Sequence, residues 1–435
     1  MKAVSSSFRD PSGYVYKEND IYLRRVSPSY QEIMMETAPL LSHLIQTGKL
    51  LPFKWISEDD IEPEQVPFIS YPYEWSFNML RDAALLTLDT QLTALDYQMQ
   101  LKDASAYNVQ FVRGKPVLID HLSFHPHVDG EPWVAYRQFC EHFLAPLLLA
   151  SYRNYDLVKL LQLDVRGLKL GVVSNLLPFR ARMRPGVLMH IVLHGLDRTS
   201  NRKVKISRKQ VANVVSSLRS LVSSLNWTPN AGWKYYEQEC NYSAAETHNK
   251  AHLVESMLRE VAAKSVLDLG CNVGLYSQVA TDIGCHTIAI DSDPACVDLL
   301  YCSNGKFDRI LPLVIDIANP SPSIGWECSE RDSFFKRLNV DTIMCLALVH
   351  HLAIGNNVPL DRIASFLATN CKNLVIEWVP KEDSKVQFML RSRRDIFDNY
   401  TEEGFLKSFG NYFNILRKEP VSVSSCRSLY LMRRR

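Results

Sequence analysis

The chain of 435 residues is too long for one ordinary hydrophobic core and predicts two or three domains. Its composition, 46% hydrophobic and 22% charged, is typical of a globular enzyme and excludes a disordered chain. Lys plus Arg number 49 and Asp plus Glu 47, so the net charge of +2 provides no field for attracting nucleic acid, and we expect no such partner.

The first residues, MKAVSSSFRDPSG, have no apolar run behind the lysine, and no stretch reaches the roughly 18 apolar residues of a membrane span. We therefore expect no membrane span and a cytoplasmic protein. The ten cysteines stand singly without a CxxC pair, which argues against a zinc site, so we expect no bound metal. No pattern in the sequence indicates the oligomeric state.

Residues 13–26 favour two short strands around a polar turn, and Ser27 with Pro28 is typical of a helix start. Residues 74–100 carry apolar side chains at helical spacing, and the following NVQFV, RGK, PVLID predicts a tight hairpin. These elements predict an α+β N-terminal domain over residues 1–160.

Asp103, Asn108 and Asp120 surround that hairpin in the order DxxxxN, hairpin, D. The segment resembles the catalytic loop of kinase-like phosphotransferases, which implies an acceptor-orienting Asp103 and magnesium ligands at the other two positions. The first 70 residues lack a Gly-rich loop and a VAIK-type lysine. A working kinase is therefore not expected, and the sequence leaves open a degenerate kinase-like scaffold or a coincidental loop and hairpin. In either case we expect the domain to help to recognise the acceptor.

A mostly helical connection is expected over residues 161–243. From residue 244 to 435, strands alternate with helices, which is typical of a parallel sheet with crossover connections. The C-terminal half is therefore the expected catalytic domain.

SVLDLGCNVG, residues 265–274, predicts a buried strand followed by a loop with Gly270 and Gly274, residues that tolerate positive φ and a close ligand. The next strand ends in Asp291, which is placed to accept both hydroxyls of a ribose. A dinucleotide site would use the same two features. As structural alternatives, Asp268 caps a turn and Asp291 is an exposed loop acid.

Two details favour a different cofactor. Asp268 lies inside the motif, and Asn272 stands where a dinucleotide fingerprint keeps a glycine for the pyrophosphate. The stretch resembles motif I of class I S-adenosylmethionine-dependent methyltransferases, whose loop wraps the methionine part of the cofactor. The resemblance implies S-adenosyl-L-methionine as the cofactor.

The resemblance continues along the chain. LPLVIDIANP places Asp316 after the third strand, where this family commonly holds the adenine amino group, although such acids also cap turns. VDTIMCLALVHHL and NLVIEWVP resemble the fourth and fifth strands, and FNILRKEPVSVSSCRSLYLMRR the closing hairpin. The implied fold is α/β, a Rossmann-like seven-stranded class I methyltransferase domain at the C-terminus.

Methyl transfer needs an aligned acceptor and, for an oxygen or nitrogen acceptor, a place for a proton. His350 and His351 lie where the fourth strand ends, and histidine titrates near neutral pH. Either is a candidate base, and the alternative places both in the wall of the cofactor pocket. Glu377, at the end of the fifth strand, is the next candidate.

Tyr242 and Lys250 belong to a stretch resembling the helix that precedes motif I, and are expected to contact the methionine carboxylate; a solvated Lys250 is the alternative. Trp326 and Arg331, the latter on a predicted helix ECSERDSFFKRL, are candidates for lining the acceptor pocket. Interior packing of Trp326 is equally compatible with the sequence.

Over its full length, through NPSPSIGW, LALVHHLAIGNNVPL and SLYLMRR, the chain resembles the NoeA-type nodulation methyltransferases of bacteria. This implies methyl transfer to an O or N acceptor on a small molecule, glycan or lipid-linked intermediate. The alternatives are an RNA or protein methyltransferase, or a non-catalytic cofactor-binding protein.

Overall fold

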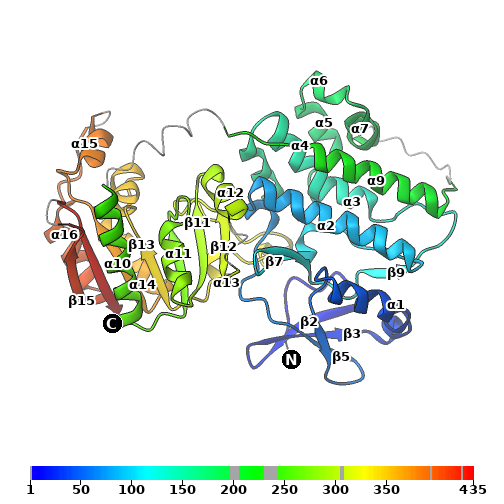
Figure 1. Cartoon of the computed structure of the whole chain (residues 1–435), viewed down its shortest axis with the longest axis horizontal. Coiled ribbons are helices and arrows are strands. Elements are labelled where there is room, and N and C mark those ends of the chain that lie inside the picture. Colours follow the sequence, from blue (N-terminus) through cyan, green and yellow to red (C-terminus); the bar gives the residue numbers. More distant parts are fainter. Residues whose placement is uncertain (1, 196–204, 230–242, 304–307, 392–393, 423–424) are drawn as a thin grey trace. The chain divides into compact units, whose positions relative to one another are not determined.

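The computed structural model describes residues 2–195, 205–229, 243–303, 308–391, 394–422 and 425–435. The chain divides into two compact units. The first comprises Met1–Thr228 and Ser321–Phe334, and the second comprises Pro229–Pro320 and Phe335–Arg435. Figure 1 labels their helices and strands. The chain therefore returns to the first unit after it has begun to build the second.

The described part of the first unit contains an antiparallel sheet with strand order β1-β2-β3-β5-β4. The predicted pair over residues 13–26 is confirmed, with Glu18 opposite Ile21. The two residues between them, Asn19 and Asp20, have φ values of 48° and 66°, as a two-residue turn of the primed type requires. The strands are β1 (Lys2–Ala3), β2 (Gly13–Glu18), β3 (Ile21–Val26), β4 (Phe53–Trp55) and β5 (Asp60–Pro63).

The helix predicted within residues 74–100 is confirmed as α2 (Phe77–Asp96), whose first turn is capped by Ser76. The predicted hairpin is confirmed as β7 (Val109–Val112) paired with β8 (Lys115–Leu118). No helix among the described residues is long and apolar enough to span a membrane. The first unit also contains α1 (Pro28–Gln46), β6 (Met99–Leu101), β9 (Phe124–Pro126), α3 (Tyr136–Phe139), α4 (Ala145–Tyr152), α5 (Leu170–Leu176), α6 (Phe179–Arg182), α7 (Pro185–Val187), α8 (Leu193–Gly195) and α9 (Arg208–Ser224).

In the second unit, the described residues form a seven-stranded sheet with the order β12-β11-β10-β13-β14-β16-β15. Neighbouring strands from β12 to β14 are parallel, whereas β16 is antiparallel to both β14 and β15. The predicted Rossmann-like sheet with its closing hairpin is therefore confirmed. The strands are β10 (Ser265–Leu269), β11 (His286–Asp291), β12 (Ile310–Val314), β13 (Thr342–Cys345), β14 (Asn373–Trp378), β15 (Phe413–Pro420) and β16 (Ser428–Arg434).

Helices cover this sheet, which explains why its parallel strands are almost continuously apolar. Helix α11 packs against β10, β11 and β12, and α10 packs against β14. The helices are α10 (Ala244–Glu260), α11 (Leu275–Asp282), α12 (Pro294–Ser303), α13 (Phe334–Arg337), α14 (Leu360–Asn370), α15 (Ser384–Leu390) and α16 (Glu402–Gly410). The parallel strands end at one edge of the sheet, where ligands bind in open α/β folds.

The segment Ser321–Phe334, which connects β12 to β13, is built into the first unit. The Phe334 side chain is fully buried, with its ring centroid 5.4 Å from that of Phe68. Glu330, 2% exposed, pairs with Arg9 at 2.7 Å between Oε1 and Nε. The first unit is thus completed by residues far along the chain.

The helix predicted around Arg331 is wrong. Arg331 forms an antiparallel bridge with Ile324, and its guanidinium lies 4.4 Å from the Tyr107 ring centroid. Left-handed backbone conformations at Gly325 and Glu327, with φ values of 84° and 55°, interrupt a regular helix. Arg331 is therefore part of the packing of the first unit.

Truncation of Phe334 tests this packing. We expect Phe334→Ala to lower the free energy of unfolding by about 3 to 5 kcal/mol, because it leaves a cavity against Phe68. Trp326→Ala is the control in the same segment; Trp326 is 64% exposed, so its loss should change stability by no more than about 0.5 kcal/mol. Urea unfolding of the full chain measures both, and equal effects would contradict the assignment.

Candidate functional site

The loop after β10 is pinned to the neighbouring strand by backbone hydrogen bonds. The N–H groups of Gly270 and Cys271 both donate to the carbonyl oxygen of Ile290, at 2.9 and 3.0 Å. Gly270 and Gly274 have φ values of 71° and 84°, so the positive φ expected for both glycines is confirmed. Asn272 also has a positive φ, 51°, which asparagine tolerates better than most residues.

Gly274 is required for space as well as for conformation. A Cβ atom there would lie 2.5 Å from Cδ1 of Leu300, on helix α12. At Gly270 the corresponding distance, to Cδ1 of Leu348, is 3.3 Å. We call the loop between these two glycines the glycine cradle. Each glycine allows the loop to pack closely against a leucine side chain, which sets the path of the loop.

Asp291 ties the glycine loop to the tip of β11. Its Oδ2 accepts a hydrogen bond from the Asn272 N–H at 2.8 Å, and its Oδ1 accepts from the Asp293 N–H at 2.9 Å. Burial raises the pKa of Asp291, against the lowering effect of these two backbone donors. A carboxylate oxygen can accept two hydrogen bonds, so each oxygen of Asp291 can still accept one from a ribose hydroxyl. The exposed-loop alternative is wrong, because Asp291 is half-buried and bonded.

Asp268, inside the motif, is 2% exposed. Its Oδ2 accepts a hydrogen bond from the Ser277 hydroxyl at 2.6 Å, which connects β10 to helix α11. Burial raises its pKa to about 6, and the nearby Asp291 carboxylate adds to the effect. Neighbouring hydrogen-bond donors or positive charges stabilise the ionised form of such a carboxyl group.

Asp316 lies just beyond β12 and is half-buried. Its Oδ1 accepts a hydrogen bond from the Ala318 N–H at 2.9 Å, as in the turn-capping alternative. The hydrogen bond at Oδ1 leaves the Oδ2 atom of Asp316 for a ligand. Contact with the adenine amino group therefore stays a prediction.

Lys250 and Glu377, predicted separately for the cofactor and for catalysis, contact each other. The Lys250 Nζ lies 2.6 Å from Glu377 Oε2, and the two side chains are 2% and 0% exposed. The Lys250 Nζ also lies 4.6 Å from the ring centroid of Tyr276. The solvated alternative for Lys250 is therefore wrong. Tyr242, its predicted companion, lies outside the described residues.

Arg427 and Asp383 extend this ion pair into a network. Arg427 Nε and Nη2 donate to the two oxygens of Asp383 at 2.7 and 3.0 Å. Nη1 of the same guanidinium lies 3.6 Å from Oε1 of Glu377. All of these side chains are less than 10% exposed. Burial raises the pKa of Asp383, but the Arg427 hydrogen bond and charge outweigh it and hold that pKa below its usual value.

Sequence reasoning missed both members of this extension. Arg427 stands directly before β16, and Ser428 pairs with Trp378, the neighbour of Glu377. The available signal was a lone arginine immediately before the apolar strand that closes the sheet. The arginine is brought close to Glu377 only by the pairing of that strand with β14.

His350 is 2% exposed, and its Nδ1 has no hydrogen-bond partner within the described residues. Burial lowers its pKa to about 3, and the positive charges of Arg427 and Lys250 contribute in the same direction. His351 is exposed, with its ring centroid 4.2 Å from that of His350. Of the two predicted histidines, His350 is therefore neutral at physiological pH, and its Nδ1 is a buried nitrogen without a hydrogen-bond partner among the described residues.

The polar residues predicted in the first unit also form a cluster. Asp103 accepts hydrogen bonds from the Ser105 N–H and from Gln138 Nε2, both at 2.8 Å. Asp120 Oδ1 lies 2.7 Å from Nη1 of Arg24.

The polar side chains of this cluster are bonded to other residues of the chain. Asn108 Nδ2 donates to the Ser123 hydroxyl at 3.3 Å. Although burial favours the neutral form of Asp120, Arg24 outweighs it, and the pKa of Asp120 is lowered. The chain thus supplies its own cation at a position where the kinase resemblance implies magnesium.

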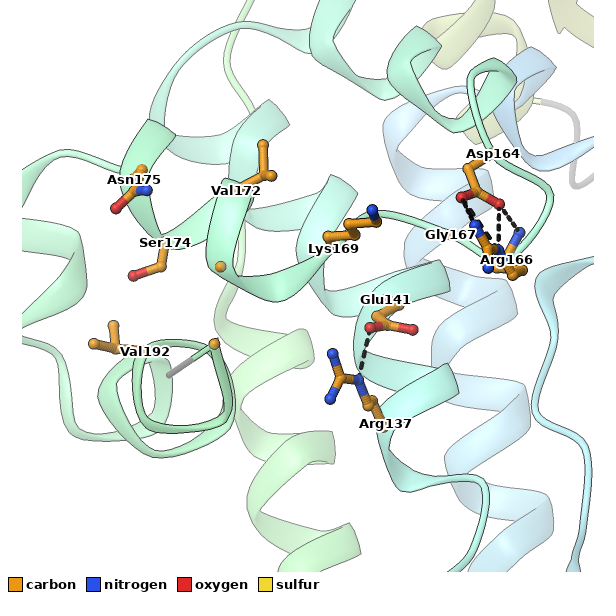
Figure 2. A pocket seen from close by; sticks show the side chains of 12 residues that line it. Arg137, Glu141, Asp164, Arg166, Gly167, Lys169, Val172, Ser174, Asn175 and Val192 are labelled. Atoms are coloured by element: carbon orange, nitrogen blue, oxygen red, sulfur yellow. Dashed lines mark hydrogen bonds and ion pairs between the residues drawn. The ribbon is translucent and has the colours of Figure 1, made fainter. Parts of the chain in front are cut away.

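The first unit contains a cavity of about 690 Å³. Figure 2 shows two ion pairs along its wall, Arg137 with Glu141 and Arg166 with Asp164. Lys169 also lines the cavity, so its charged lining consists of three cations against two carboxylates. None of the residues predicted to bind the cofactor lines it.

The strand order and the glycine loop after β10 define the second unit as a Rossmann-like domain of the class I methyltransferase type. Among curated proteins, the chain is 34% identical to Nodulation protein NoeA from Rhizobium meliloti (strain 1021), over 99% of this chain and 96% of that protein. The chain belongs to the NoeA family. No protein-family model matches it.

Solved structures with a similar fold include the N-methyltransferase NodS from Bradyrhizobium japonicum WM9, at 12% identity and a TM-score of 0.33, covering 44% of this chain and 98% of NodS. Magnesium protoporphyrin IX methyltransferase (ChlM) from Synechocystis PCC 6803 gives 16% identity and a TM-score of 0.34, covering 47% and 95% of the two chains. Similarity at this level does not extend the activities of those enzymes to this chain.

Substitution of Gly274 tests the cradle. We expect Gly274→Ala to lower stability by at least about 1 kcal/mol, because the new Cβ meets Leu300 and the backbone keeps a positive φ. Gly410→Ala is the matched control, because Gly410 lies in α16 with open space around it, and should be neutral or stabilising by about 0.5 to 1 kcal/mol. Calorimetric unfolding measures both, and an unaffected Gly274→Ala would contradict the close approach.

Proposed function

We propose that the protein is an S-adenosylmethionine-dependent methyltransferase that binds its cofactor at the carboxyl edge of the second-unit sheet. The observation that carries this proposal is the hydrogen bond between the Asn272 N–H and Asp291, which closes a glycine cradle against the tip of the neighbouring strand. When bound, the cofactor supplies an activated methyl group.

Each cofactor-binding residue has a distinct proposed role. Gly270, Asn272 and Gly274 shape the loop around the methionine part, and Asp291 accepts the ribose hydroxyls. Asp268 provides a buried carboxyl group beneath the loop. The second oxygen of Asp316 is proposed to accept from the adenine amino group.

Lys250 is proposed to attract the carboxylate of the cofactor through its positive charge. Its ammonium is held by Glu377 and lies over Tyr276, so its position is defined before any ligand arrives. A cation at this place favours the cofactor carboxylate through charge attraction in a poorly solvated environment. We therefore keep Lys250 among the proposed cofactor-binding residues.

Among the candidate bases, the geometry favours His350 as the group that contacts the acceptor. A neutral imidazole with an unpartnered Nδ1 orients an acceptor N–H or O–H by accepting its hydrogen bond. Glu377 is a weaker proton acceptor, because it already balances Lys250 and lies near Arg427. The exposed ring of His351, next to His350, is the proposed place where the proton leaves for solvent.

The acceptor is proposed to be an oxygen or nitrogen atom of a small molecule, glycan or lipid-linked intermediate. The name of the relative, Nodulation protein NoeA, does not specify an acceptor. The first unit is proposed to recognise the acceptor, and Arg24 against Asp120 disfavours phosphoryl transfer there. An RNA acceptor would instead produce RNA binding that weakens steeply as salt is added.

Cofactor binding provides the first test of this proposal. Calorimetry of the full chain with S-adenosylhomocysteine is expected to show binding, weakened at least several-fold in Asp291→Ala, because the ribose hydroxyls lose their acceptor. The Asp316→Ala variant should retain more affinity, since the proposed adenine contact is a single hydrogen bond. Absence of binding to the unmodified protein would contradict the proposed site.

The role of His350 provides the second test. With a pKa of about 3, His350 is neutral throughout pH 5 to 8, so titration of this ring should produce no break in the rate of methyl transfer over that range. His350→Ala should keep S-adenosylhomocysteine affinity and lower the turnover rate by about tenfold or more. The assay follows transfer of a labelled methyl group to fractionated cell extract. Loss of cofactor affinity in His350→Ala would instead place His350 in the wall of the cofactor pocket.

A further inference from the structure

Two exposed histidines of α10 point their ring nitrogens at each other. His248 and His252 are four residues apart, and their Nε2 atoms lie 3.0 Å from one another. The ring centroids are 4.4 Å apart, and the ring planes are nearly perpendicular, at 87°. The pair lies on the labelled helix α10 of the second unit (Figure 1).

This geometry restricts the protonation states of two free imidazoles. A neutral ring has one N–H and one lone pair, so a direct hydrogen bond between the two Nε2 atoms needs opposite tautomers. If both rings were protonated, two N–H groups would face each other at 3.0 Å. A metal ion between the two lone pairs removes both restrictions, because it accepts electron density from both nitrogens.

The spacing is suitable for chelation by a helix. Residues four apart lie on the same helix face one turn from each other, and two histidines at this spacing are the helical ligand pair of many zinc sites. Both histidines are solvent-exposed, so an ion reaches them without opening the fold. An exposed site also leaves room for water molecules as the remaining ligands.

Helix α10 holds the pair rigidly. Its first turn is closed by a reciprocal cap, in which the Ser243 hydroxyl accepts from the Glu246 N–H and Glu246 Oε2 accepts from the Ser243 N–H. Its opposite face is buried through Val254 and Met257, and through Lys250 paired with Glu377. Little entropy is therefore lost when the two rings converge on an ion.

We propose that His248 and His252 form a binding site for one late first-row divalent transition-metal ion, such as Cu²⁺ or Zn²⁺, per chain. Imidazole nitrogen suits these ions, with Cu²⁺ bound most tightly, whereas Mg²⁺ requires oxygen ligands. No group of three or more candidate metal-ligand side chains occurs among the described residues, so water completes the coordination. The cysteine spacing, which argued against a zinc site, carries no information about this histidine pair.

The site also has a consequence for α10. An ion that binds the folded helix stabilises it by mass action, because the unfolded chain lacks the preformed pair. Helix α10 carries Lys250 on its buried face, so the ion stabilises the helix that positions this proposed cofactor-binding residue. The metal site does not depend on the methyltransferase proposal, since its evidence lies on the exposed face.

Titration of the full-length chain, without a histidine tag, with CuCl₂ and ZnCl₂ tests the proposal. Calorimetry should show one ion per chain, and the electron paramagnetic resonance spectrum of the Cu²⁺ form should show coupling to two imidazole nitrogens. We expect His248→Asn and His252→Asn each to weaken binding by about tenfold or more, because each variant leaves a single imidazole. MgCl₂ should give no binding heat.

His286→Asn is the matched control, because His286 is an exposed histidine of the same unit that lies on β11. It should bind Cu²⁺ and Zn²⁺ as the unmodified protein does. ZnCl₂ should raise the unfolding temperature of the unmodified protein and of His286→Asn, but not that of His248→Asn. All variants should unfold at the same temperature in a chelator, which shows that they are folded.

Three outcomes would overturn the proposal. One is equal metal affinity in His248→Asn and the unmodified protein. Another is a stoichiometry of one ion per two chains, which would make the site an interface between copies. The third is a Cu²⁺ spectrum without coupling to two nitrogens.

Discussion

The hydrogen bond from the Asn272 N–H to Asp291 is the constraint on which the candidate cofactor site depends. It joins the loop after one strand to the end of the next, and with the two bonds to the Ile290 carbonyl it defines the path of the loop. The positive φ at Gly270 and Gly274 is a consequence of that path. Bonds formed in advance reduce the ordering that a ligand must otherwise supply.

The charged side chains Lys250, Glu377, Asp383 and Arg427, which form one network in the second unit, are all buried. A buried carboxylate such as Glu377 is stable only if its charge is balanced. Lys250 comes to it from helix α10, and Arg427 from the position directly before the closing strand β16. Burial keeps His350 neutral by lowering its pKa, and the same two cations add to that effect. One network of ion pairs therefore balances the buried charges at this edge.

The two units are also linked in how they are built. The connection between β12 and β13 contributes Glu330 and Phe334 to the first unit, where they meet Arg9 and Phe68. Asp316, the proposed adenine contact, lies at the start of this same connection, just after β12 and before Ser321.

Sequence alone determined the local features, because they depend on neighbours in the chain. The glycine loop at 265–274, the strands that alternate with helices, and the hairpin of the first unit were all readable from spacing and residue type. What required the tertiary structure were contacts between residues far apart in sequence. The partnership of Lys250 with Glu377, the addition of Arg427, and the return of Arg331 to the first unit depend on strand pairing and packing, which a linear pattern does not contain.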